Sequence, residues 1–165
     1  MHEELGSLVI LGKMSSVSTT PPVETDEVFL NDMVCFALHA ASRAVTATYR
    51  PLLEPLGLTY PQYLVLSALW EQDDQTVGEL VEIMQLDYGT MTPLLKRLEK
   101  RGLVRRTRSP DDERSVIVGL TAEGSGLRDH AKGIYQAISD MFDFSPNRVR
   151  AARKLLQSIV AKASQ

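Results

Sequence analysis

The segment from Thr76 to Leu120 constrains the fold more than any other part of this 165-residue chain. It opens with the sequence TVGE, in which the Thr76 hydroxyl and the Glu79 carboxylate can each satisfy a free backbone N–H at a helix start. We expect a short helix over TVGELVEIM, and then a turn at Leu86–Asp87. A second helix follows the turn, and its apolar stripe is Met91, Leu94, Leu95 and Leu98.

Two predicted strands follow that second helix. Gly102 stands where a glycine commonly ends a helix, and Pro93 predicts either a late start or a local distortion of the helix before it. The sequences LVRRTR and SVIVGL have the composition of β-strands, and the polar hexamer from Ser109 to Arg114 between them is typical of a loop. Two short helices, a turn and a two-stranded hairpin, in this order, predict a winged helix-turn-helix.

The flanking segments predict helices on both sides of this unit. A long helix is expected over about residues 26–54, and another starts at Thr59-Tyr60-Pro61, where proline suits the first helical turn. After the hairpin, Thr121 caps a helix that extends to about Phe142. The pair Ser145–Pro146 starts a final helix that carries its own apolar stripe.

The predicted fold is therefore mainly α with a small β-hairpin wing. Residues 26–165 form one domain, in which residues 59–121 are the winged helix-turn-helix and residues 26–58 and 122–165 are dimerisation helices. Residues 1–25 include the run SSVSTTPP without hydrophobic periodicity, which predicts a flexible N-terminal tail.

The charge of the chain is unevenly distributed. The formal net charge is −3, yet the residues from Leu94 to Arg114 include eight Lys or Arg against four Asp or Glu. A local basic surface indicates a polyanionic partner, although a solvated helix face has the same composition. Its position on a helix-turn-helix and the adjoining hairpin favours double-stranded DNA.

In this arrangement the helix after the turn enters the major groove, and the hairpin reaches the flanking backbone or minor groove. Hydroxyl groups can contact phosphates or base edges, and cationic side chains can reach phosphates or guanine. The residues expected to contact DNA on this basis are Thr90, Thr92, Lys96, Arg97, Arg106 and Arg114.

Other classes of protein have little support in the sequence. Three scattered histidines and one cysteine give no metal-ligand spacing, and the HExxH, Gly-Lys phosphate-loop and GxSxG motifs are absent. No run approaches the ~20 apolar residues that span a bilayer. One cysteine and the lack of a secretory pattern favour the cytoplasm. We therefore expect no enzyme activity, no cofactor, no metal and no membrane association.

The sequence LVRRTRSPDDERSVIVGLT closely resembles the wing of the MarR family of dimeric repressors. The family's loop carries an Asp-x-Arg motif, here Asp112 and Arg114, whose arginine enters the minor groove and whose aspartate helps to hold it. Tyr88 stands at the position of a helix serine in some relatives. The resemblance implies that Tyr88 contacts DNA, but it leaves undecided which base Tyr88 prefers. The segment VCFALHAASRAVTATYRPLLEPLGLTYPQYLVLSALWE is similar to the organic-hydroperoxide-sensing branch, the OhrR-type repressors, and the resemblance extends over about residues 32–131.

That resemblance implies a role for Cys35, the only cysteine of the chain, as a redox sensor whose sulfur is hydrogen-bonded by the hydroxyls of Tyr49 and Tyr60. Without it, a lone cysteine in an apolar segment is more often a packing residue. Cys35 and Tyr49 are 14 residues apart, or ~21 Å along a helix, so their contact has to cross between the subunits of a homodimer. His39 departs from the one-cysteine type, which has a tyrosine there; it either tunes the thiol or is a polar residue tolerated at an interface.

Hydroxyl donors favour the thiolate, which attacks a peroxide oxygen and becomes a sulfenic acid. Because the chain has no second cysteine, a small cellular thiol or a backbone nitrogen would cap that product. The predicted function is a repressor that senses organic hydroperoxides through Cys35 and then releases an operator built as an inverted repeat. Two alternatives stay open: a MarR-type regulator released by a small aromatic ligand, and, with less support, a thiol peroxidase.

Overall fold

The computed structural model describes residues 29–110, 112, 114–142 and 145–163, and the chain divides into two units, residues 1–38 and 39–165. The predicted tail over residues 1–25 lies outside the described residues. The first unit contains a short 3-10 helix, Leu30–Asp32, and the start of helix α1. Helix α1, Val34–Leu53, continues into the second unit.

The start of the first long helix differs from the sequence prediction. Among the described residues, a continuous helix begins at Val34, because Met33 has an extended backbone (φ −79°, ψ 112°) that separates α1 from the preceding 3-10 helix. The predicted start near residue 26 is therefore wrong. Pro51 lies inside α1 near its end, and a 3-10 helix, Glu54–Leu56, follows.

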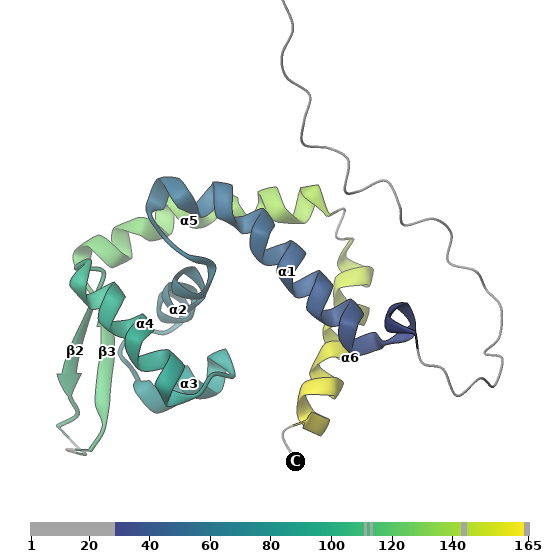
Figure 1. The fold of residues 1–165 in the computed structure, drawn as a ribbon. Helices are drawn as coiled ribbons and strands as arrows, with labels where there is room; N and C mark the ends of the chain where they lie inside the picture. The colour runs from purple at the N-terminus through teal and green to yellow at the C-terminus, as the bar shows by residue number, and fades with distance from the viewer. Residues whose placement is uncertain (1–28, 111, 113, 143–144, 164–165) are drawn as a thin grey trace, which may run out of the picture. The chain divides into compact units, whose positions relative to one another are not determined.

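The second unit has the predicted order of a winged helix-turn-helix followed by two helices (Figure 1). Its remaining elements are α2 Tyr60–Glu71, β1 Gln75–Thr76, α3 Val77–Met84, α4 Tyr88–Lys100, β2 Val104–Arg108, β3 Val116–Leu120, α5 Ala122–Met141 and α6 Pro146–Ala163. The mainly α fold with a small β wing is confirmed.

The sheet that contains the hairpin has a third strand, β1, which sequence analysis missed. Strands β2 and β3 pair antiparallel over five residue pairs, and β1 pairs antiparallel with the other side of β3, with Gln75 opposite Val118. The buried Gln75 amide donates hydrogen bonds to the carbonyls of Ala68 (3.0 Å) and Gln72 (2.8 Å), which ties β1 to the end of α2. Two residues are too few to show an alternating pattern, so this strand leaves no periodic signal.

Helix α4 is oriented by its apolar stripe. All four predicted stripe residues are buried, and Met91, Leu95 and Leu98 are at most 1% exposed. Each such side chain contributes about 1.5–3 kcal/mol by its burial. Of the two alternatives predicted at Pro93, the late start is wrong, because α4 begins at Tyr88 and continues through Pro93; the local distortion stays a prediction.

Side-chain caps define the starts of three helices. Glu79 N–H donates to the Thr76 hydroxyl (3.2 Å) and Thr76 N–H donates to the Glu79 carboxylate (2.7 Å), which confirms the predicted capping box of α3. Thr90 N–H donates to Asp87 (2.8 Å) at the start of α4, and Thr121 caps α5. The hydrogen bonds from Thr76 and Thr90 favour the charged carboxylates, so they lower the pKa of Glu79 and of Asp87.

The helices predicted to form a dimer leave apolar side chains uncovered in the single chain. Helix α6 has no buried residue, and α1 buries only Tyr49 and Leu53. The large apolar residues exposed on α5 and α6 are Tyr135, Met141, Leu155, Leu156 and Val160. Such a surface is typical of a protein–protein interface.

The first turn of α5 provides a test of the packing. A Cβ on the buried Gly124 would lie 1.9 Å from the Leu103 carbonyl oxygen, whereas a Cβ on Gly126 would meet nothing within 4 Å. We predict that Gly124→Ala lowers the free energy of unfolding by about 3 kcal/mol through overpacking. The matched Gly126→Ala should raise it by about 0.5–1 kcal/mol, because alanine is the better helix former. Urea denaturation measures both, and shifts of the same sign would contradict this packing.

Candidate nucleic-acid interface

The exposed face of α4 carries the predicted polar and cationic residues. Thr90, Lys96 and Arg97 are exposed and Thr92 is half-buried, as expected when the opposite face is packed into the core. The Thr90 hydroxyl donates to the Asp87 carboxylate (2.8 Å) and so belongs to the helix cap. It keeps its acceptor lone pairs for another donor.

The structure brings four of the predicted DNA-contacting residues together at one hollow between α4 and the wing. The hollow has a volume of about 350 Å³, and its lining includes Tyr88, Thr92, Arg106 and Arg114. Helix α4 and the hairpin lie beside one another (Figure 1). Thr90 and Arg97 line a separate hollow of about 710 Å³, and Lys96 lines neither.

The loop of the wing is held by Asp112. Its carboxylate accepts hydrogen bonds from the Arg114 backbone N–H (3.0 Å) and from the Ser115 hydroxyl (2.7 Å). These two hydrogen bonds, the one from Ser115 first, lower the pKa of Asp112. Asp112 thus holds Arg114 through its backbone, and the Arg114 side chain is exposed at the tip.

Three arginines of the basic segment bind groups within the fold. Arg101 donates to the backbone carbonyls of residues 56 and 57, Arg105 pairs with Asp74 (2.7 Å), and Arg106 pairs with Glu99. A count of charges in the sequence cannot separate these arginines from the others. Apart from Arg101, the cations of this segment that have no ion-pair partner among the described residues are Lys96, Arg97, Lys100, Arg108 and Arg114.

The two tyrosines expected to serve the sensor lie in ring contact. Tyr49 is buried, and its ring centroid lies 4.5 Å from that of Tyr60 and 5.9 Å from that of Tyr63. Burial, reinforced by neighbouring tyrosines, raises the pKa of Tyr49 to about 12 and also raises the pKa of Tyr60. Both hydroxyls therefore stay protonated and able to donate at neutral pH. Sequence analysis missed Tyr63 as part of this cluster.

Cys35 is exposed in the single chain, and His39, one turn later on α1, is exposed as well. Apolar side chains surround the cysteine in sequence. Those exposed among the described residues of the first unit are Phe29, Leu30, Met33, Val34 and Phe36. A thiol on an uncovered apolar segment is accessible for chemistry or for burial by another chain.

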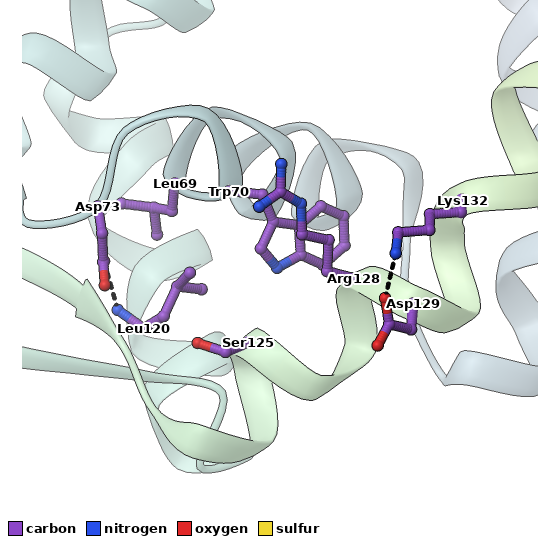
Figure 2. Close-up of a pocket in the computed structure, with 8 residues that line it drawn as sticks. All are labelled: Leu69, Trp70, Asp73, Leu120, Ser125, Arg128, Asp129 and Lys132. Atoms are coloured by element: carbon purple, nitrogen blue, oxygen red, sulfur yellow. Dashed lines mark hydrogen bonds and ion pairs between the residues drawn. The ribbon is translucent and has the colours of Figure 1, made fainter.

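A third hollow, of about 540 Å³, is lined by residues of α2, β3 and α5 (Figure 2). The Asp73 carboxylate in it accepts from Leu120 N–H (2.8 Å), and Lys132 pairs with Asp129 (2.5 Å). None of the predicted DNA-contacting or redox residues lines this hollow. Much of its polar lining is already engaged within the fold, so we assign it no ligand.

Metal-binding clusters and membrane-spanning helices are absent from the part of the chain that the structure describes. It contains no group of three or more His, Cys, Asp or Glu side chains that could hold a metal ion. Across the same residues, every helix is too short or too polar to span a bilayer.

Comparisons with known proteins identify the family of this chain. Residues 58–116 match the model of the MarR family. The chain is 41% identical over 140 residues to the organic hydroperoxide resistance transcriptional regulator of Bacillus subtilis, which covers 85% of this chain and 95% of that protein. The chain belongs to the MarR family, and it is a DNA-binding transcriptional regulator rather than an enzyme.

Two solved structures of a staphylococcal relative show the same fold. Reduced AbfR bound to DNA is 32% identical with a TM-score of 0.69, and covers 82% of this chain and 95% of that chain. Overoxidised AbfR bound to DNA is 33% identical with a TM-score of 0.67, and covers 81% and 94%. AbfR comes from Staphylococcus epidermidis.

The wing can be tested through its exposed arginine. Arg114→Ala should weaken DNA binding by about 1–3 kcal/mol if the tip of the hairpin enters the minor groove. The probe is a duplex that the native protein selects from a randomised library, which we expect to be an A·T-rich inverted repeat with half-sites ~34–36 Å apart. Arg128→Ala, on the exposed face of α5, should bind like native protein in the same anisotropy titration. Unchanged affinity for Arg114→Ala would show that the tip of the wing does not contribute to DNA binding.

Proposed function

We propose that this protein is a dimeric repressor that releases its operator when an organic hydroperoxide oxidises Cys35. The observation that carries the proposal is the ring contact between Tyr49 and Tyr60, two phenols able to donate hydrogen bonds, in a chain with a single cysteine. Two phenol donors whose rings are in contact suit one sulfur anion, provided that both hydroxyls point toward it. The 41% identity to an organic hydroperoxide resistance regulator supports this assignment.

The sensor is assembled between two subunits. Cys35 and Tyr49 belong to one continuous helix, α1, and its rise of 1.5 Å per residue separates them by ~21 Å. The tyrosines of one subunit therefore serve the cysteine of the other. The exposed apolar residues beside Cys35 and along α6 support a dimer, because a second subunit would bury them. Burial of the residues beside Cys35 would also give the thiol an apolar setting, which favours an alkyl hydroperoxide.

The chemistry requires two steps. The Cys35 thiolate attacks the terminal oxygen of the hydroperoxide; an S–O bond forms, the O–O bond breaks, and the departing alkoxide takes a proton to become an alcohol. The cysteine is oxidised to the sulfenic acid. A small thiol then displaces the hydroxyl group, which leaves a mixed disulfide and releases water.

The cap supplies the volume that moves the subunits. Oxidation to the sulfenic acid adds a single oxygen atom, whereas a small thiol adds several heavy atoms at a subunit junction, and overpacking of that kind costs about 1–3 kcal/mol. The structure of overoxidised AbfR bound to DNA supports this distinction, because an overoxidised relative is found on DNA. By linkage, DNA should favour the reduced state.

The first test of this function removes the proposed donors singly. Tyr49→Phe and Tyr60→Phe should leave DNA binding of reduced protein nearly unchanged but slow release by cumene hydroperoxide about tenfold or more, because each deletes a hydrogen bond to a charged sulfur. Tyr63→Phe, in the same ring cluster, is the matched control and should release like native protein. Cys35→Ser should not release at all. A native response of both donor variants would show that these tyrosines only pack.

A second test concerns the cap. Peroxide alone should release DNA poorly, and peroxide with added cysteine should release it well, because only the mixed disulfide overfills the subunit junction. Retention on the selected duplex is measured with and without the thiol, and intact mass is read in parallel. Full release of protein whose Cys35 is unmodified would overturn the mechanism.

One observation favours a second candidate, a regulator released by a small aromatic ligand. The hollow of about 710 Å³ is mainly apolar, and its lining includes Tyr60, Leu64, Met84 and Leu86. The Cys35→Ser variant separates the two functions, because a ligand-released regulator would keep its response to inducer without the thiol.

A further inference from the structure

The ion pair between Arg106 on strand β2 and Glu99 on helix α4, which we call the bridge, joins the wing to α4. Glu99 lies in the last turn of α4 and Arg106 lies on β2, seven residues later. The Arg106 Nε donates to Glu99 Oε2 at 2.9 Å, and its Nη2 donates to the same oxygen. The side chains are only 26% and 37% exposed, so the pair is partly shielded from solvent.

We propose that Arg106 is a positioning residue, which sets the hairpin against α4 through Glu99 and does not itself neutralise a DNA phosphate. Sequence analysis grouped Arg106 with the DNA contacts because of its charge. In the structure that charge is already compensated, and a phosphate contact would have to compete with a forked, charge-assisted hydrogen bond.

The bridge lies beside the residues that we expect to contact DNA. Arg106 lines the hollow that also includes Tyr88 and Thr92 on α4 and Arg114 at the tip of the wing. The residues expected in the major groove and the residue expected in the minor groove therefore line the same hollow as Arg106. Removal of the bridge should leave each DNA-contacting residue in the protein. The wing would, however, no longer be held in a fixed position relative to α4.

Arg108 offers a matched comparison on the same strand. It lies two residues after Arg106, and side chains two apart on a strand point to the same face. Arg108 is exposed and has no ion-pair partner among the described residues, so it is available for a phosphate. The two arginines have the same charge and different surroundings.

The test measures the affinity for the selected duplex over a range of salt concentrations. Arg108→Gln should weaken binding and reduce the slope of log K against log salt by about 0.9 for each phosphate that the variant no longer neutralises. Arg106→Gln should weaken binding about tenfold at an unchanged slope. A reduced slope for Arg106→Gln, equal to that of Arg108→Gln, would show a direct phosphate contact and overturn the proposal.

Glu99→Gln separates positioning from electrostatics by the sign of its effect. It removes a negative charge near DNA, so electrostatics alone predicts tighter binding. Removal of the bridge predicts weaker binding, and the double variant Glu99→Gln with Arg106→Gln should bind no more weakly than Arg106→Gln alone. Tighter binding by Glu99→Gln would overturn the proposal.

Hydroxyl-radical footprinting distinguishes this role from a simple decrease in stability. Both bridge variants should lose protection at the flanks, where the wing binds, and keep protection over the major-groove half-sites. A merely structural defect would weaken both regions together and in proportion to a lowered melting temperature, which would count against positioning. The inference rests on DNA binding alone and is independent of the Cys35 chemistry.

Discussion

Burial of one face of α4 determines which of its side chains are exposed to solvent. Met91, Leu95 and Leu98 are almost completely buried, so the polar residues between them have only the opposite side of the helix available. Truncating one such residue costs about 2–5 kcal/mol, which is a large part of the stability of a domain this size. The chemistry of the exposed face of α4 therefore depends on the buried residues of the opposite face.

The arginines of the basic segment show why charge alone is a poor guide to binding. Arg105 meets Asp74 from 31 residues earlier, and Arg101 meets the carbonyl of Gly57 from 44 residues earlier. Such partners are brought together only by the tertiary fold. A sequence therefore shows where cations accumulate, and the structure shows which of them brace the fold.

The sequence was most informative where a local rule decides the structure. The capping box at Thr76, the glycine after α4 and the buried stripe each follow from neighbouring residues, and all were confirmed. Two features that depend on distant residues were missed, namely strand β1 and the contact of Tyr63 with Tyr49. The start of α1 was wrong for a local reason, the extended backbone of Met33. For the candidate site, sequence analysis named the exposed residues of α4 and the wing but could not show that Asp112 holds Arg114 by its backbone.

The tight contact at Gly124 has a mechanical consequence. With almost no space between the first turn of α5 and the Leu103 carbonyl, and with the Trp70 indole bonded to the Gly124 carbonyl (2.9 Å), this end of α5 is fixed to the base of the hairpin. A 20-residue helix is ~30 Å long, so a tilt of about 5° displaces its far end by roughly 2.5 Å. Helix α5 can thus act as a rigid lever, which converts a small change at one end into a displacement of atomic size at the other.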